Sequence, residues 1–467
     1  MINKILDLKY TWSLEAEPRA LSHRVLIVSP HFPPINAPDH QRIRISLPYF
    51  QEFGWEPHIL TVHPDYIQGV HDPLLEQTIP SNITVTRTGA LPIKYTRRVG
   101  LGNLGLRCLP YLLRAGNQIL AQEKFTLVYF STTMFPVMAL GPRWCRRFGI
   151  PYVLDFQDPW VSDYSYGSGS KPPGGQLKYG FSQFIARVIE PKAMRHVSHA
   201  ISVSPEYPKT LLRRYSWLRE EQFTVLPFGA AKQDFELLPT LNIQQKIFEL
   251  NDGKQHWVYV GRGGGDMAFA LRSLFQALAR VREQEPQKFS NLMLHFIGTD
   301  YAPEDRARKT IEPIAVECGV DDIVQEHTQR IPYFEALQCL LDADALIVPG
   351  SDDPSYTASK IYPYILAKKP LLAIFHEKSS VVNVLESTKA GTVVTFATGD
   401  DTIKVSQAIE TNWLQSIPPL KPVTDWEAFM PYTAREMTRR QCTVFEQCLL
   451  SANKPISAKF ADSPRAS

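Results

Sequence analysis

The chain of 467 residues is 44% hydrophobic and 21% charged, with a formal net charge of +3. These values are ordinary for globular proteins and exclude a fibrous or fully disordered chain. The mean hydropathy is −0.18, and no apolar run approaches the roughly 18 residues that a membrane-spanning helix needs. At roughly 150 residues per domain, we expect two or three domains.

The two ends of the chain are predicted to lie outside the folded domains. Residues 1–22 lack periodicity and are predicted to form a loose extension, and residues 452–467 a disordered tail. Charged residues interrupt the region where a secretory signal needs an apolar core: Asp7, Lys9, Glu15 and Glu17. We therefore expect a cytoplasmic protein. The six cysteines lack CxxC spacing and indicate neither a disulfide framework nor a zinc site.

Short β-rich runs alternate with helical segments along residues 23–235, which indicates a parallel α/β domain. The expected strands are residues 24–29, 58–62, 125–131, 152–156, 199–204 and 225–229. A helix is expected over residues 43–53, ended by Gly54. In the Leu-rich residues 101–120, Pro110 and several glycines are expected to break regular helical periodicity.

A second series of the same kind covers residues 236–424, after a polar connection with a helical patch at 230–254. Its expected strands are residues 256–261, 292–298, 345–350, 371–375 and 392–396, and its expected helices are residues 268–283, 307–318 and 359–367. Residues 425–451 are expected to form a last helix. The predicted fold class is α/β, with two doubly wound, Rossmann-like domains facing each other across a central cleft.

The small net charge conceals a basic stretch. Between Gln77 and Leu154 the chain has one acid, Glu123, and ten basic residues, including Arg97, Arg98, Arg107 and Arg114. Such a stretch attracts anionic partners, or it forms an ordinary solvated face. The segment 101–120 is a candidate for contact with an anionic membrane surface. No nucleic-acid-binding module is present, so we do not expect a nucleic-acid partner.

Two segments of the second series could bind phosphate. Gly261, Arg262, Gly263 and Gly264 form a turn between a strand and a helix, where glycines allow close approach of an anion and Arg262 adds charge. A flexible turn without a ligand is the alternative, because Asp266 replaces the last glycine of a dinucleotide-binding motif. After the strand at 345–350, Ser359 is expected to cap a helix that begins with Lys360.

Polar side chains also follow strands of the first series. His31, Asn36 and Arg42 lie in the loop after the first strand, and Asp155 and Asp158 end a later one. In a doubly wound sheet these positions face a ligand. The two carboxylates can accept a sugar hydroxyl or cap a loop, and His31 is either a base or a structural hydrogen-bonding group. No metal site is expected.

Taken together, these segments resemble the glycosyltransferase family 4-like enzymes with the GT-B fold. The matching stretches occur in family order over residues 24–396: VLIVSPHFPP, YVLDFQDPW, AISVSPEY, VLPFGA, WVYVGRGGGD, LHFIGT, DADALIVPGSDD and SKIYPYILAKKPLLA. The resemblance implies a retaining transfer, without metal or cofactor, from a nucleotide-sugar donor held by the second domain. The acceptor, a glycan or a lipid-linked molecule, would lie on the first domain at the inner membrane face.

The resemblance also implies roles for single residues and shows one departure. Arg262, Lys360 and His31 become the candidate catalytic groups, and Tyr362 matches the aromatic of the family's Ser-Lys-x-x-Glu-Tyr helix. The glutamate that binds the donor ribose in the family is Pro363 here, and its partner is Ser355. Asp352 and Asp353 are the candidates to replace that contact.

Three functions remain open. The leading one is a glycosyltransferase of cell-surface polysaccharide synthesis. The second is a GT-B binding or scaffold protein that has lost transfer, which Pro363 and Ser355 favour. The third is a sugar-nucleotide epimerase of similar fold.

Overall fold

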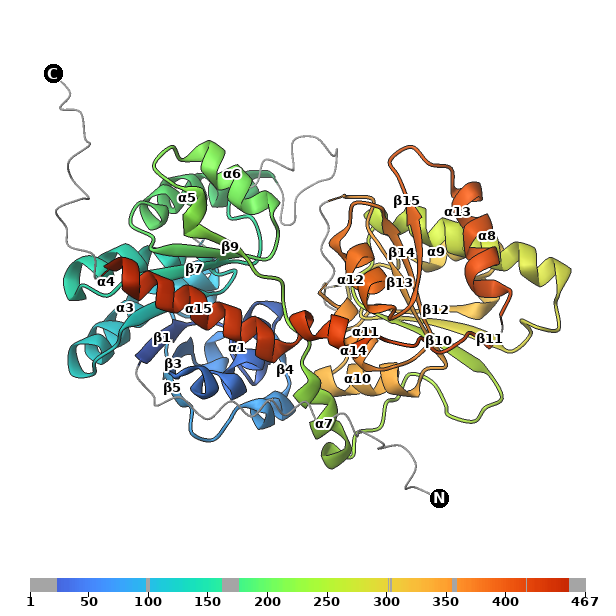
Figure 1. Cartoon of the computed structure of the whole chain (residues 1–467), viewed down its shortest axis with the longest axis horizontal. Coiled ribbons are helices and arrows are strands. Elements are labelled where there is room, and N and C mark those ends of the chain that lie inside the picture. The colour runs from blue at the N-terminus through green and yellow to red at the C-terminus, as the bar shows by residue number, and fades with distance from the viewer. Residues whose placement is uncertain are drawn as a thin grey trace.

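The computed structural model describes residues 23–97, 101–161, 176–300, 302, 305–354, 359–416 and 418–452. The predicted extension, nearly all of the predicted tail, and the positions Arg98 and Ser355 lie outside these residues. Two α/β domains lie side by side, each with its own sheet (Figure 1). The predicted fold class is therefore confirmed.

The first domain is built on a parallel sheet of seven strands in the order β5-β3-β1-β6-β7-β8-β9. The strands are β1 (His23–Val28), β3 (Trp55–Val62), β5 (Thr84–Thr88), β6 (Leu127–Ser131), β7 (Tyr152–Phe156), β8 (His199–Ser202) and β9 (Phe223–Val225). A short antiparallel pair, β2 (Ile35–Asn36) and β4 (Val70–His71), lies outside this sheet. The chain starts in the middle and winds outward both ways, as a doubly wound sheet does.

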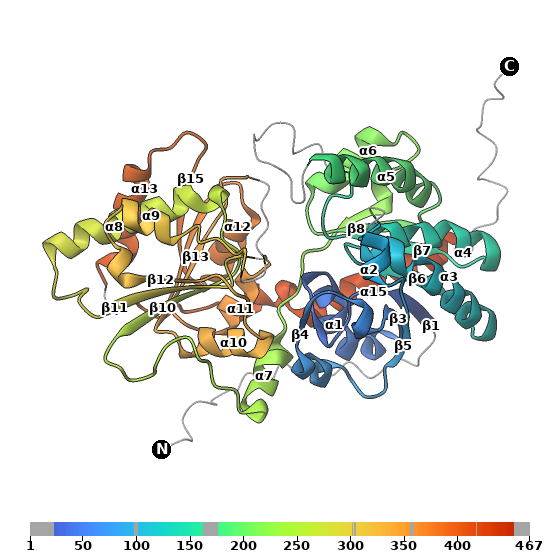
Figure 2. The ribbon, with the colours of Figure 1, turned by 180° about the vertical axis from the view of Figure 1, so that it is seen from behind.

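Both faces of this sheet are covered, because successive side chains of a strand point to opposite faces. Leu26 and Val28 pack under α3 (Leu104–Gln122), α4 (Leu140–Phe148) and α5 (Gln176–Met194). Val25 and Ile27 pack under α1 (Gln41–Ser46) and α15 (Ala434–Ala452). Figure 2 shows the first of these faces, with α6 (Glu206–Arg214) and the short α2 (Ile93–Thr96) nearby.

The second domain has a parallel sheet of six strands in the order β12-β11-β10-β13-β14-β15. Its strands are β10 (Gln255–Val260), β11 (Leu292–Ile297), β12 (Val324–His327), β13 (Ala345–Pro349), β14 (Leu371–His376) and β15 (Thr392–Phe396). Its helices are α8 (Ala268–Gln284), α9 (Glu312–Glu317), α10 (Tyr333–Asp342), α11 (Ile361–Leu366), α12 (Ser380–Thr388) and α13 (Thr402–Ile409). The point where the strand order reverses lies between β10 and β13, and ligands of such sheets bind there.

Several predicted elements have different bounds in the structure, and proline explains two of them. The predicted helix at 43–53 ends as an α-helix at Ser46 and continues as 3₁₀ turns around Pro48. The last helix is interrupted around Pro431 into α14 (Trp426–Phe429) and α15. Pro110, in contrast, does not break α3, which runs unbroken because its apolar face packs into the core.

The remaining differences concern strands. The predicted strand at 225–229 is wrong for most of its length, since β9 ends at Val225 and the following residues cross to the second domain. The sequence analysis also missed β5 and β12, which are short and half-exposed strands at the sheet edges. Among the described residues, none of the helices has the length and apolar character to cross a membrane.

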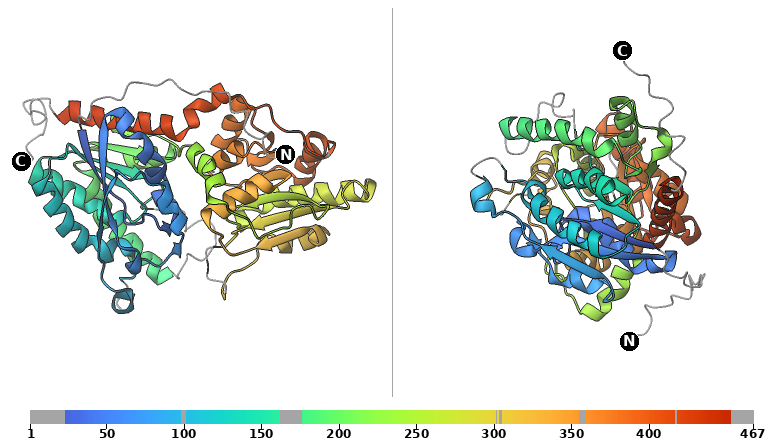
Figure 3. Two further views of the ribbon diagram at one scale, coloured as in Figure 1. Left: turned by 90° about the horizontal axis from the view of Figure 1, so that it is seen from below. Right: turned by 90° about the vertical axis from the view of Figure 1, so that its left-hand side faces the viewer.

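The chain passes between the domains twice, and the two crossings are bonded to each other. The amide of Ala230 donates to Tyr432 (2.7 Å), and the amide of Ala434 donates to the carbonyl of Ala230 (2.9 Å). A Cβ on Gly229 would lie 2.6 Å from the Cα of Ala434, so this approach requires glycine. After the second crossing, α15 returns along the first domain (Figure 3), where Phe445 packs in its core.

Candidate functional site

A cleft of about 590 Å³ lies between the two domains, at the carboxyl ends of their strands. Both domains contribute polar side chains to its lining. They include Asn36, Asp39, Thr133, Asp158 and Tyr207 from the first domain, and Arg262, Arg330, Asp353, Ser359, Lys360 and Tyr362 from the second. The expected position of a ligand site in two facing doubly wound domains is therefore hollow and polar here.

The Gly-rich turn after β10 approaches Lys360 closely. A Cβ on Gly261 would lie 2.3 Å from the Nζ of Lys360, so only glycine fits under this ammonium group. Arg262 follows on the turn and binds Asp266 through both terminal nitrogens, at 2.9 and 2.7 Å. The turn thus brings two cationic side chains from separate elements to one wall of the cleft, beside a single carboxylate.

Tyr259, a buried residue of β10, holds Lys360 in this position. The Nζ of Lys360 donates a hydrogen bond to the Tyr259 hydroxyl and lies 4.6 Å from the centre of its ring. The hydroxyl in turn donates to the carbonyl of Arg262 (2.8 Å). Burial and the nearby Arg262 guanidinium lower the pKa of Lys360 to about 7. An anion bound here would relieve that repulsion, so the pair favours a phosphate.

The helix α11 supports this wall but differs from the prediction at its start. Lys360, not Ser359, is the N-cap residue, and no side chain caps the helix, so the predicted cap is wrong. Ser359 and Tyr362 do line the cleft, and Pro363 lies beside them. The ring of Tyr362 stacks on Tyr432, and burial raises its pKa.

The other predicted donor-side residues divide into two groups. Asp353 lines the cleft, whereas Asp352 is exposed and its amide bonds the carbonyl of Asp266 at 2.8 Å. Gly263 and Gly264 are not among the cleft-lining residues of the described chain. Gly263 instead lies against Thr310, where a Cβ would approach the hydroxyl to 2.5 Å. These two glycines shape the turn, and Gly261 is the one that faces the cleft.

On the first domain, His31 lies behind Asp39. Its Nδ1 is 2.9 Å from an oxygen of Asp39, whose other oxygen accepts from the hydroxyl of Thr132 (2.9 Å) and the amide of Thr133 (3.2 Å). Burial opposes the charge of Asp39, but His31 and these donors hold its pKa at about 2. In the part of the chain that the structure describes, Asp39 and not His31 lines the cleft. His31 therefore orients a carboxylate and does not itself face the cavity.

Arg42 and Asp155 do not have the predicted substrate-facing position. Both are fully buried, and the Nε of Arg42 bonds a carboxylate oxygen of Asp155 at 2.9 Å. Arg42 also donates to the carbonyls of Leu226 (2.7 Å) and Pro227 (3.2 Å). The pair therefore fixes the start of the first crossing to the sheet. A fully buried charge requires a partner of opposite charge, and the side chain of Asp155 points into the domain, where it pairs with Arg42.

Asn36 and Asp158 occupy the cleft wall as the sequence analysis expected. The surrounding protein and the nearby Asp39 raise the pKa of Asp158 to about 6. Burial raises the pKa of Tyr207, on the same domain, to about 12, and the charges of Asp158 and of Asp353 on the other domain raise it further. Tyr207 thus lies near a carboxylate of each domain at the cleft.

Arg330, Tyr207 and Asp39 are cleft residues that the sequence analysis missed. Arg330 follows β12, and because that strand was not recognised, its loop was not seen as a ligand-facing strand end. Asp39 lies in the loop that was expected to face a ligand, but it was not predicted to be a binding residue. In the described residues, no group of three or more His, Cys, Asp or Glu side chains is arranged to hold a metal ion.

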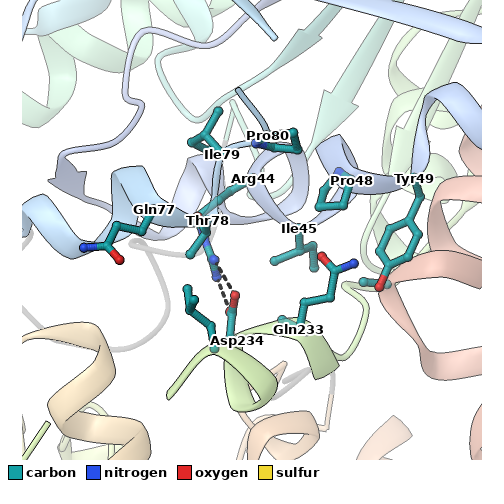
Figure 4. A pocket seen from close by; sticks show the side chains of 13 residues that line it. Arg44, Ile45, Pro48, Tyr49, Gln77, Thr78, Ile79, Pro80, Gln233 and Asp234 are labelled. Atoms are coloured by element: carbon teal, nitrogen blue, oxygen red, sulfur yellow. Dashed lines mark hydrogen bonds and ion pairs between the residues drawn. The ribbon is translucent and has the colours of Figure 1, made fainter. Parts of the chain in front are cut away.

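A second cavity of about 260 Å³ lies beside the cleft, where the first domain meets the connecting helix α7 (Lys232–Leu241) (Figure 4). Arg44 on α1 forms two bonds with Asp234 on α7, at 2.8 and 2.7 Å. Tyr333 of the second domain donates to the same carboxylate (2.6 Å), and its amide donates to Asp72 of the first domain (2.7 Å). These groups form a seam that bonds the two domains and the connection together.

Comparison with known proteins agrees with this architecture. Residues 9–229 match the profile of the glycosyl transferase 4-like domain, and no curated protein sequence matches significantly. A glycosyltransferase from Rickettsia africae is similar, with a TM-score of 0.54 and 12% identity over 91% of this chain and 98% of that one. HepE of Anabaena, in complex with UDP, is similar with a TM-score of 0.51 and 16% identity over 94% of this chain and 99% of that one. The N-terminal domain of Candida albicans trehalose-6-phosphate phosphatase is similar with a TM-score of 0.59 and 11% identity over 92% of this chain and 98% of that one. At these identities the likeness shows the fold, which is GT-B.

Proposed function

We propose, from the premise that residues 9–229 match the glycosyl transferase 4-like domain, that the protein transfers a sugar from a nucleotide-sugar donor to a glycan or lipid-linked acceptor. The observation that carries the proposal is the pair Arg262 and Lys360 at the strand-order reversal of the second sheet. A nucleoside diphosphate leaving group develops negative charge as the glycosidic bond breaks, and preorganised cations at that point stabilise it.

The donor would then lie on the second domain and the acceptor on the first. The structural likeness to HepE, solved in complex with UDP, supports a nucleotide on this fold. We propose that the transfer is retaining and needs no metal ion, with Arg262 and Lys360 supplying the charge, and that it serves cell-surface polysaccharide synthesis at the inner membrane face. The test is release of a nucleoside diphosphate from a panel of nucleotide sugars, with and without EDTA.

The first prediction concerns the donor phosphates. Arg262→Ala should weaken binding of a nucleoside diphosphate about tenfold or more, because a charge-assisted hydrogen bond contributes roughly 1.5–3 kcal/mol. Isothermal titration measures the affinity, and circular dichroism confirms the fold.

Two controls make the result specific to the turn. Arg272→Ala removes an exposed arginine of α8 that pairs with Glu317 and should leave the affinity unchanged. The double variant Arg262→Ala with Asp266→Asn tests whether an unpaired Asp266 alone repels the phosphates. Unchanged affinity in Arg262→Ala would remove Arg262 from the site.

The second prediction concerns the contact with the donor ribose. Pro363 lies on the cleft at the position where the resemblance implies a ribose-binding glutamate. Pro363→Glu should tighten nucleoside-diphosphate binding several-fold, because a carboxylate can accept from ribose hydroxyls. The comparison is with Pro363→Gln, which has the same length without charge. Loss of affinity in both variants would show that the pocket is built around proline and other groups.

A further inference from the structure

Helix α5 of the first domain exposes an apolar stripe. Phe181, Phe184 and Val188 are 47%, 64% and 41% exposed. Their spacing of three and four residues places them on one face of the helix. The opposite face carries Ala186, Glu190 and Ala193, which are buried against the domain. Three large apolar side chains in a row on the solvent side are unusual for a helix that needs no partner.

The same face becomes basic toward the end of the helix. Lys192 lies four residues after Val188 on this face, Arg195 follows directly after the helix, and both are exposed. The one acid in the α5 sequence, Glu190, is turned inward, where it accepts from the Tyr215 hydroxyl (2.8 Å) and bonds Arg214. The outward face therefore combines apolar and positively charged side chains.

The neighbouring helices add charge and little apolar surface. Arg143, Arg146 and Arg147 are exposed on α4, and Arg114 is exposed on α3, which lies beside α4 (Figure 2). The apolar face of α3 is in the core, and Arg107 is buried with bonds to the carbonyls of Leu91 and Tyr66. In residues 101–120 the structure exposes one large apolar side chain, Tyr111 at 40%, so α5 has the larger exposed apolar stripe of these helices.

We propose that the outward face of α5 inserts into the surface of an anionic lipid bilayer. Apolar side chains that enter the acyl boundary, beside Lys and Arg that meet anionic headgroups, are the features of interfacial helices. A second copy of this chain is the less favourable occupant, because two copies would bring the same positive charges together. The proposal extends the proposed function, since an acceptor in the membrane would then reach the cleft beside α6, which carries Tyr207.

The test is flotation of the full chain with vesicles of phosphatidylcholine alone or of phosphatidylcholine and phosphatidylglycerol in equal parts. We expect binding to the anionic vesicles only, weakening as salt is added. Lys192→Gln with Arg195→Gln should lower the partition coefficient about 30-fold, since each charge near the surface contributes about 1 kcal/mol. Phe181→Ser with Phe184→Ser should lower it at least about tenfold. Leu420→Ser with Val423→Ser, at side chains 78% and 87% exposed on the second domain, should leave it unchanged.

Failure of the membrane proposal can be distinguished from failure of the proposed function. The α5 variants should bind a nucleoside diphosphate as the parent chain does, because none of their residues lines the cleft as described. Equal binding to neutral and anionic vesicles, or equal loss in the Leu420 and Val423 control, would overturn the proposal. So would a dimer in light scattering that the Phe181 and Phe184 changes dissociate while vesicle binding persists.

Discussion

Lys360→Ala should lower the turnover of sugar transfer about a hundredfold while raising the donor KM much less. The ammonium group faces the place where the leaving diphosphate gains charge, so its contribution grows between the bound state and the transition state. Removal of one such donor from an electrostatic site typically costs 10²–10³-fold in kcat. Steady-state kinetics with the donor that the panel identifies measures both parameters.

The pH dependence gives a second readout for the same group. Because the pKa of Lys360 is lowered to about 7, its charge is present below that pH and is lost as pH rises through it. Donor affinity should therefore fall between pH 6 and 8 more steeply in the parent chain than in Lys360→Met. The protonation of the nucleotide is the same in both and cancels in the comparison.

A structural role for Lys360 would give a different pattern. Lys368→Ala is the matched control, since this lysine follows α11 and lies over the Trp426 ring, 5.1 Å from its centre. It should change neither parameter. If Lys360→Ala instead lowers the yield of folded protein and leaves the kcat of the folded fraction unchanged, Lys360 has no part in the transfer step.

Asp155→Ala should destabilise the chain by about 3–5 kcal/mol, because it leaves the fully buried Arg42 without its carboxylate. Urea unfolding followed by fluorescence and by circular dichroism measures the change. Asp158→Ala, three residues along and open to the cleft, should not destabilise the chain, because the raised pKa of Asp158 means that its charge opposes folding at neutral pH.

A double substitution tests whether the loss of stability comes from the unpaired charge of Arg42. Replacing both residues, with Arg42→Met and Asp155→Leu, should recover much of the stability, as apolar groups often replace a buried ion pair without penalty. Arg42 also bonds the carbonyls of Leu226 and Pro227, so recovery should be incomplete. If the single Asp155→Ala variant is as stable as the parent, the pair does not fix the crossing.

Much of the fold follows from local pattern in the sequence. Buried parallel strands are continuous apolar runs, and those at 152–156 and 392–396 end where the sequence analysis placed them. Edge strands such as β5 and β12 are only partly buried and contain threonine, glutamine or glutamate, so the same criterion misses them. Pro110 and Pro48 show that the effect of proline depends on tertiary packing, which one sequence does not reveal.

For the candidate site, sequence position identified Arg262 and Lys360, because each follows a recognisable strand and turn. It could not separate Asp155 from Asp158. Both lie at the end of β7, but Asp155 is the last residue but one of the strand and points into the domain, whereas Asp158 lies beyond it and reaches the cleft. The direction of a side chain at a strand end is set by the pleat and by what packs above it.

The bonded pair of crossings at Ala230 and Tyr432–Ala434 also determines how the cleft can change its width. Two tethers that meet at one point act as a pivot, so sliding of one domain past the other would have to break their hydrogen bonds. A rotation about this point that opens the cleft would also have to break the bonds of Tyr333 to Asp72 and Asp234, and it would move groups far from the pivot furthest. Arg262 and Lys360 belong to one body and keep their mutual geometry throughout. Tyr207 and Asp353 belong to different domains, so the distance between them would change with the rotation and would measure it.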